Sequence, residues 1–248
     1  MVQLFNTLLT QPLFNALVFL YDIIPGNNLA LAIIVLTIFI KLALYPLASQ
    51  AIKSQKALQE LQPKLNELKA RHKNNREALA KATMELYKAE KVNPLSSCLP
   101  LLIQLPFLIA VFHVFNSGLN TESLGQLYSF VPNPGHLDTM AFGLDLSKAN
   151  LVLAVLTGLA QYFQTKMLTH TRQPKVTGAK DEDMMAQVNK QMMYMMPVIT
   201  VVIGASLPSG LLIYWLTTTV LTIAQQYLVF GKKKTKLEII DKPNNESL

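Results

Sequence analysis

Charged residues are scarce in this sequence, because only 15% of its 248 residues are Asp, Glu, Lys or Arg. A soluble domain usually carries about 25%. Hydrophobic residues make up 51% of the chain, and they occur in blocks separated by stretches that hold most of the charge. A run of about 18 or more apolar residues predicts a transmembrane helix. The composition therefore argues against an ordinary soluble domain and predicts a polytopic, all-α membrane protein.

Cysteine pairs, catalytic motifs and acidic residues within the apolar blocks are also missing. The single cysteine, Cys98, excludes an internal disulfide or a cysteine-based metal framework. Proton relays and cation transporters usually need a carboxylate within the membrane, and the blocks contain none. There is no HExxH motif and no Ser-His-Asp arrangement. We therefore expect no enzyme and neither a cofactor nor a metal ion.

Five apolar blocks are long enough to cross most of a hydrocarbon core that is roughly 30 Å thick. We expect the spans at residues 29–52, 94–116, 149–168, 190–207 and 208–229. Lys and Arg are absent from the first 28 residues, and Lys148 is the only one in the loop after the second block. Because cytosolic loops are enriched in Lys and Arg, we expect the N-terminus outside and the C-terminus in the cytosol.

The first 28 residues are apolar but contain several polar interruptions. Five leucines fall at helical spacing, namely Leu4, Leu8, Leu13, Leu17 and Leu20. We expect an amphipathic helix on the outer surface, and a sixth span is the alternative. The remaining connections are expected as an outer loop, a cytosolic loop and a basic cytosolic tail, at residues 117–148, 169–189 and 230–248.

Residues 53–93 form the one long polar segment between two blocks, and ten Lys and Arg lie in it. Leucines at alternating steps of three and four residues predict a coiled-coil seam, followed by the turn sequence HKNN and a second helix. We expect a cytosolic helical hairpin that binds a partner through basic residues: Lys64, Lys69, Arg71, Lys73 and Arg76. The alternatives are that these charges only set the topology, or that they meet anionic lipid or RNA phosphates.

Lys41 is the most unusual residue within a block, because a cation at the centre of a span costs about 2.5–3.5 kcal/mol on insertion scales. It lies at a depth similar to that of several other polar residues, which are Thr37, Gln104, Gln161, Gln164, Thr218 and Gln225. If these faces converge, they line a hydrated cavity open to the cytosol. The alternatives are interhelical hydrogen bonds for each glutamine and snorkelling of Lys41 to the interface.

Several motifs resemble those of the YidC family of membrane protein insertases. They are Asn93-Pro94 and Cys98-Leu99-Pro100 before Gln104, LQPK in the hairpin, GLAQYFQTKM (158–167), QMMYMMPVI (191–199) and LPSGLLIYWLTTTVLTIAQQYLV (207–229). The resemblance covers roughly residues 10–230. Lys41 stands where the family usually has arginine, and Thr218-Thr219 replaces its usual Ser-Asn or Asn-Asn. The large outer domain of many Gram-negative members is not expected in this chain.

The resemblance implies a five-helix core with a hydrophilic groove, in a bacterial cytoplasmic membrane. It implies a function in which nascent membrane proteins enter the groove from the cytosol and leave into lipid without ATP. It adds Tyr214 and Trp215 to the groove residues. The implied partners are nascent membrane proteins, phospholipids, ribosome–nascent chain complexes, the signal recognition particle receptor and the Sec translocon, with no specific nucleic-acid sequence. A non-inserting scaffold or assembly chaperone and a small transporter are the alternatives.

Overall fold

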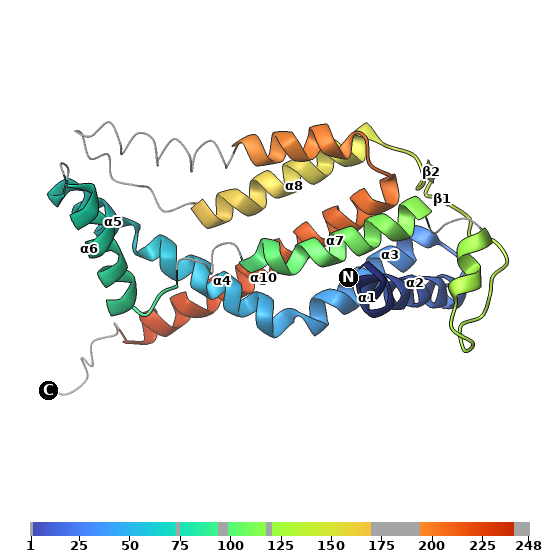
Figure 1. Ribbon diagram of the computed structural model, residues 1–248, viewed down its shortest axis with the longest axis horizontal. Helices are drawn as coiled ribbons and strands as arrows, with labels where there is room; N and C mark the ends of the chain where they lie inside the picture. The colour runs from blue at the N-terminus through green and yellow to red at the C-terminus, as the bar shows by residue number, and fades with distance from the viewer. Residues whose placement is uncertain (1, 73–74, 94–98, 118–120, 170–193, 241–248) are drawn as a thin grey trace, which may run out of the picture.

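The protein is an elongated helical bundle, seen in a computed structural model that describes residues 2–72, 75–93, 99–117, 121–169 and 194–240 (Figure 1). The all-α prediction is confirmed. The helices are α1 (Val2–Phe5), α2 (Gln11–Ile23), α3 (Leu29–Ala43), α4 (Tyr45–Glu60), α5 (Gln62–Arg71), α6 (Arg76–Ala89), α7 (Leu99–Ser117), α8 (Leu151–Thr169), a helix at Tyr194–Gly204 and α10 (Ser209–Ile240). A π-helical turn, η1 (Asn6–Thr10), joins α1 to α2, and a 3-10 helix, η3 (Thr121–Gln126), precedes a small antiparallel hairpin of β1 (Met140–Ala141) and β2 (Leu144–Asp145).

The first predicted span is not one straight helix. Helix α3 ends at Ala43, and the helical segment that follows, Tyr45–Arg71, is bent away from it by 69°. Pro46 lies in the first turn of α4, where its missing N–H and its ring are tolerated, whereas inside a continuous helix they would remove a hydrogen bond and clash. The block at 29–52 is therefore divided, and its second part leads into the polar segment.

By length and apolar composition, few helices of the described residues could cross a membrane alone. The stretch Gln3–Ile23 qualifies, and the bent pair that starts at Leu29 would be a second. The helices Leu102–Phe115 and Tyr194–Gly204 are apolar but shorter, and α8 and α10 carry several Thr and Gln residues that lower their mean hydropathy. The count of five spans therefore stays a prediction, as does the surface position of the first helix.

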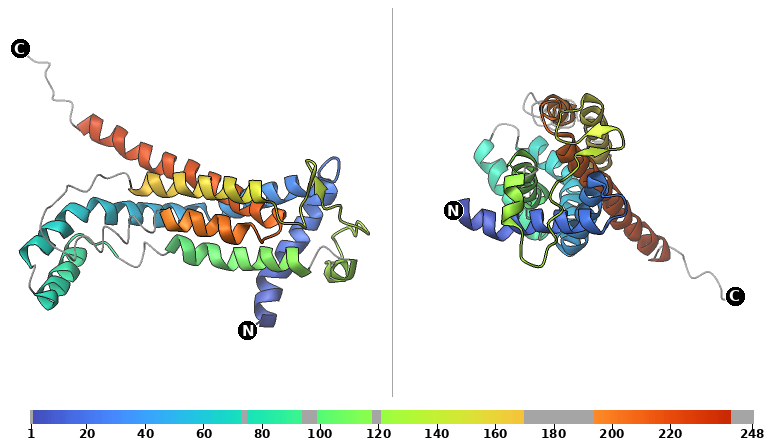
Figure 2. Two further views of the ribbon diagram at one scale, coloured as in Figure 1. Left: turned by 90° about the horizontal axis from the view of Figure 1, so that it is seen from above. Right: turned by 90° about the vertical axis from the view of Figure 1, so that its right-hand side faces the viewer.

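The N-terminal helix runs across the end of the bundle instead of along it, as both views of Figure 2 show. Its polar residues hold the loop after α7. The side chain of Asn15, which is 3% exposed, accepts a hydrogen bond from the Tyr128 backbone N–H at 2.6 Å and donates to the Gln126 carbonyl at 3.4 Å. The Tyr21 hydroxyl accepts from the Asp138 N–H at 3.0 Å. Asn15 and Tyr21 of the N-terminal segment thus hold the loop after α7 in place.

The apolar core lies at this same end of the molecule. The N-terminal helix contributes Leu17 and Val18, the bundle contributes Ile33 and Val114, and the loop contributes Leu137, all nearly inaccessible to solvent. The polar residues Lys41, Gln104 and Gln164 are not part of this core.

Helix α10 starts in close contact with α7. The backbone N–H of Gly210 donates to the Leu146 carbonyl at 2.9 Å, and the N–H of Ser209 donates to the Lys148 carbonyl at 2.8 Å. These bonds hold the first turn of α10 against the ring of Phe115, which is buried. Only a residue without a Cβ fits here. A Cβ at position 210 would lie 2.1 Å from Cε1 of Phe115 and 2.4 Å from its Cζ.

Gly210→Ala should therefore destabilise the protein, since overpacking a well-packed contact usually costs about 1–3 kcal/mol. The measurement is thermal unfolding of the detergent-purified protein. Gly125→Ala is the matched control, because nothing lies within 4 Å of a Cβ there. Adding Phe115→Leu should recover part of the loss, which a double-mutant cycle would show as a coupling between the two sites. Equal stability of Gly210→Ala and Gly125→Ala would contradict the contact.

Helices α5 and α6 form the expected antiparallel pair at the far end from the N-terminal helix (Figure 1). Leu65 of α5, and Leu61 just before it, are buried. Lys64 forms an ion pair with Glu90 across the pair. The position of this pair in the cytosol stays a prediction. Helix α10 continues to Ile240, so the segment expected as a tail begins as helix, and residues 241–248 lie outside the described residues.

Candidate functional site: a polar cavity within the helical bundle

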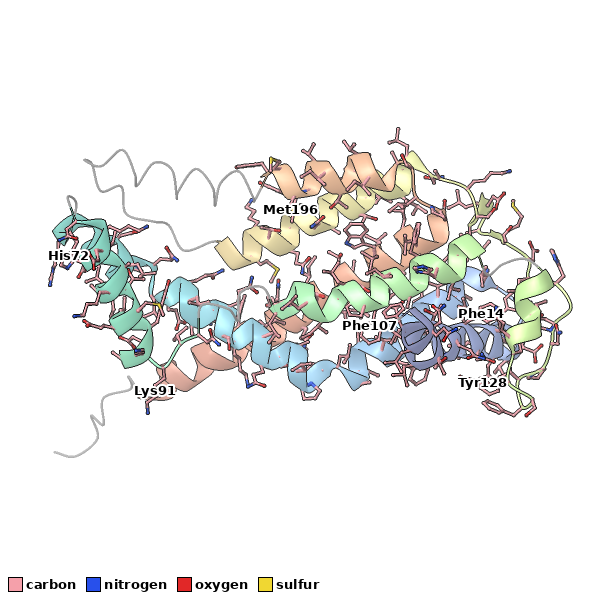
Figure 3. All side chains as sticks on the ribbon, in the orientation of Figure 1. Phe14, His72, Lys91, Phe107, Tyr128 and Met196 are labelled. Atoms are coloured by element: carbon pink, nitrogen blue, oxygen red, sulfur yellow. The ribbon has the colours of Figure 1, made fainter. Side chains whose placement is uncertain are left out.

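A cavity of about 240 Å³ lies between α3, α4, α7, α8 and α10. Its walls combine apolar side chains with amides, hydroxyls and one ammonium group. Figure 3 shows the side chains and labels Phe107 of α7, one of the apolar lining residues. The cavity borders Thr37, Ile40, Lys41, Leu44, Ala48, Ile52, Pro100, Ile103, Gln104, Leu105, Phe107, Leu108, Gln161, Gln164, Tyr214, Trp215, Thr218, Thr219, Thr222 and Gln225.

The structure brings together all nine residues that the sequence predicted for the groove. They are Thr37, Lys41, Gln104, Gln161, Gln164, Tyr214, Trp215, Thr218 and Gln225. Their exposure differs, however. Thr37 is only 1% exposed, and its hydroxyl donates to the Ile33 carbonyl at 2.6 Å, so it adds little polarity to the wall. That these residues act as a substrate groove remains a proposal.

Lys41 reaches across the cavity to α10. Its Nζ donates to Oγ1 of Thr222 at 2.8 Å, and the Thr222 hydroxyl donates in turn to the Thr218 carbonyl at 2.7 Å. Among the described residues, no carboxylate pairs with Lys41. An ammonium has three N–H donors, and buried charges are usually paired. The cavity therefore holds a cation that lacks an anion.

Thr222 is not among the residues predicted for the groove, although it accepts the hydrogen bond from Lys41. The spacing along the sequence points to Thr222 as a lining residue, because it lies one helical turn after Thr218 and shares its face of α10. What the sequence could not supply was the partner. Residues 41 and 222 are 181 positions apart in the chain, so only the packing of α3 against α10 brings them into contact.

Three of the glutamines form hydrogen bonds between helices, as the alternative interpretation of each expected. Gln104 of α7 donates to the Tyr214 hydroxyl at 2.7 Å, and Gln225 donates to Oγ of Ser49 at 2.9 Å. The side chain of Gln161 accepts from Thr200. These bonds fix the helices that surround the cavity, and they also keep amide groups in its wall.

The basic residues predicted for the hairpin are not equivalent. Lys64 is paired with Glu90, whereas Lys69 and Arg71 lie in the last turn of α5. Arg76 begins α6, and Lys73 lies outside the described residues. An open hollow between the two helices is lined by both charged and apolar residues, including Lys64, Arg71 and Leu86.

No group of three His, Cys, Asp or Glu side chains that could hold a metal ion occurs in the described part of the chain. The cavity offers hydrogen-bonding groups and a positive charge. Its chemistry suits reversible binding of polar or anionic groups.

Comparison with known proteins points to one family. Residues 19–236 match the family model described as 60Kd inner membrane protein. The membrane protein insertase YidC of Fusobacterium nucleatum is 36% identical over 206 residues, which cover 83% of this chain and 88% of that protein. The YidC of Citrifermentans bemidjiense is 34% identical, and the match covers 89% of this chain but 36% of that protein.

A solved structure agrees with the sequence matches. The crystal structure of an active YidC insertase, with its first transmembrane domain resolved, superposes with a TM-score of 0.58 at 27% sequence identity. The match covers 87% of this chain and 46% of that chain. This chain therefore spans most of the relative from Fusobacterium and less than half of some larger relatives. Together with the extent of the family match, these likenesses show that the chain belongs to the YidC family of membrane protein insertases.

Proposed function

We propose that this chain inserts nascent membrane proteins, by admitting a polar segment of the client into the cavity and releasing its apolar segment into lipid. The observation that carries the proposal is the ammonium of Lys41, which has no carboxylate partner among the described residues and lies in a wall of amides and hydroxyls. A single cation among neutral hydrogen-bonding groups suits a chain segment that carries carboxylates and free peptide groups.

The physical problem that such a cavity solves is the desolvation of peptide groups. Each unsatisfied backbone group costs several kcal/mol within the hydrocarbon region. Hydroxyls, amides and water in the cavity supply replacement partners over the inner part of the crossing. The attraction between Lys41 and an acidic client residue adds about 4 kcal/mol at 4 Å if the effective dielectric constant is about 20.

Burial of the client's apolar segment supplies the driving force, at about 25 cal/mol per Å² removed from water. On this basis no nucleotide hydrolysis is needed. The route to lipid is short, because residues of α7 near the cavity have apolar side chains exposed on the outside of the bundle. Leu102 is 57% exposed and Ile109 is 43% exposed.

The size of the cavity limits what it can admit at rest. Its volume of about 240 Å³ is below the range of roughly 300–1,000 Å³ that is usual for pockets holding small molecules. A short polar segment fits the cavity only if the surrounding helices separate. We infer that α7 or α8 moves away from α10 during insertion.

Reconstitution tests the function directly. Purified protein in liposomes should insert an in vitro translated single-span client with an acidic N-terminal segment, measured as protection of that segment from added protease. Protein-free liposomes give the background. A scaffold that does not insert clients would give only that background, although the client would still co-purify with the protein. A transporter would give neither result.

The partners and the topology belong to the same proposal. We infer that clients arrive as ribosome–nascent chain complexes, directly or through the signal recognition particle receptor, and that the Sec translocon can act beside the protein. Phospholipids surround the bundle. The N-terminal helix would lie on the outer surface and the α5–α6 pair in the cytosol, as the distribution of Lys and Arg indicates.

Water should reach the cavity from one side of the membrane only. Single cysteines replacing Lys41, Gln104 or Gln164, in a Cys98→Ala background, should react with a membrane-impermeant maleimide from the cytosolic side. The closed apolar core at the other end explains the asymmetry. Ile109→Cys, on the exposed apolar face of α7, is the control and should stay unreactive. Labelling from the outer side would contradict a cavity closed at that end.

A further inference from the structure

The turn of the small β-hairpin contains Phe142, an aromatic residue with an unfavourable backbone conformation and an exposed side chain. Strands β1 and β2 pair Ala141 with Leu144, which leaves Phe142 and Gly143 as the two turn residues. Their φ angles are +53° and +75°, as in a type I′ turn, where Asn-Gly is the preferred pair. A bulky residue at positive φ is strained. Phe142 is also 68% exposed, so packing within the protein does not compensate.

The rest of the hairpin is held firmly, so the strain is not an effect of a loose loop. Asp145 accepts hydrogen bonds from Thr139 and from both the N–H and the hydroxyl of Ser147, and it forms an ion pair with Lys148 at 3.0 Å. The Ser147 hydroxyl and the Lys148 ammonium hold the pKa of Asp145 well below its usual range. Leu146 beneath the hairpin is fully buried.

Exposed apolar side chains occur both at this hairpin and at the neighbouring start of α8. Along β1 the buried Ala141 alternates with Met140, which is 54% exposed. The hairpin lies beside the start of α8 (Figure 1), whose first residues Leu151 and Val152 are 62% and 67% exposed. These two residues lie at the start of the predicted third span, and the hairpin lies next to them.

From this placement we propose that Phe142 and Met140 insert into the lipid at the membrane interface and anchor this end of the bundle. The apolar body of a phenylalanine suits that environment, and its burial there offsets the strained turn. The tip of the hairpin, residues 140–144, contains no charged side chain that lipid would repel. The proposal is independent of the proposed insertase function, because it requires only that the protein lies in a bilayer.

Tryptophan fluorescence in lipid nanodiscs tests the contact. Trp215 is the only tryptophan of the chain, so a Trp215→Phe background makes Phe142→Trp a single reporter. We expect blue-shifted emission and at least twofold stronger quenching by lipids brominated near the head group than for His136→Trp, an exposed position of the same loop. Emission typical of water would overturn the proposal. Blue-shifted emission without bromine quenching would also overturn it, by showing that protein covers the ring.

Hydrogen exchange of a second variant changes in opposite directions with and without the lipid contact. Phe142→Asn suits the type I′ turn, so without lipid contact it should slow hydrogen exchange of the amides of residues 140–145. If lipid anchors the ring, the same change should speed that exchange several-fold in nanodiscs, since the anchor is lost. Slower exchange of the variant in nanodiscs would therefore refute the anchor. This measurement keeps Trp215 in place, so it does not depend on the background used for fluorescence.

Discussion

Lys41→Glu should abolish growth complementation of an insertase-depleted strain, Lys41→Ala should impair it strongly, and Lys41→Arg should be close to neutral. The ammonium is the one charge in the cavity wall, and it has no carboxylate partner among the described residues. A hydrogen bond to the neutral hydroxyl of Thr222 leaves its charge available to a client. Glutamate at this position would repel the acidic segments that lysine attracts.

The size of the effect follows from the electrostatic contribution. A loss of about 1.4 kcal/mol lowers an equilibrium or rate tenfold, and hydrogen bonds to charged groups contribute about 1.5–3 kcal/mol. We therefore expect insertion of clients with acidic N-terminal segments to fall by about 10- to 100-fold in Lys41→Ala. Clients with neutral segments should be affected less. The rate of insertion into liposomes measures both classes.

Lys41→Met separates the charge from the shape of the side chain, because methionine keeps an unbranched chain and carries no ammonium. It should behave as Lys41→Ala does. Neither variant should unfold the protein, since removing an unpaired cation from the membrane also removes its desolvation cost, and the Thr222 hydroxyl keeps its bond to the Thr218 carbonyl. Full complementation by Lys41→Met for acidic clients would mean that Lys41 only snorkels towards the interface.

Replacing residues 61–91 by a flexible Gly-Ser linker should abolish insertion and leave the bundle folded. These residues comprise α5, α6 and the turn between them, and the two helices pack mainly against each other. Helix α6 packs chiefly against α5, so removing both helices together leaves the contacts among the remaining helices in place. The measurements are client insertion and thermal unfolding of the purified variant.

Charge reversal distinguishes a binding surface from a spacer. Lys69→Glu combined with Arg71→Glu should weaken insertion several-fold if the last turn of α5 meets an anionic partner, and it leaves the pair between Lys64 and Glu90 intact. Lys81→Glu combined with Lys88→Glu, at exposed positions of α6, changes the net charge by the same amount and is the control. Full activity of the linker variant would show that the helix pair is dispensable.

Patterns that are local in the chain predicted much of this protein. The scarcity of charge and the apolar blocks predicted an all-helical membrane protein, and the fold and the family matches confirm that class. The depth of Lys41, Gln104 and Gln164 within their blocks, with the motif around Tyr214, predicted residues that the structure places around one cavity. Such predictions succeed because helical rise and hydropathy depend only on neighbouring residues.

Contacts between distant segments could not be predicted in this way. The position of α2 across the end of the bundle includes a hydrogen bond from the Tyr128 backbone to Asn15, 113 positions away. Lys41 donates a hydrogen bond to Thr222, and Gln161 accepts one from Thr200 of another helix. Which polar groups meet is set by how whole helices pack, because each buried donor takes the acceptor that packing brings within reach. The apolar core closes one end of the bundle for the same reason, and the cavity that holds Lys41 lies beside it, with Tyr214 bordering both.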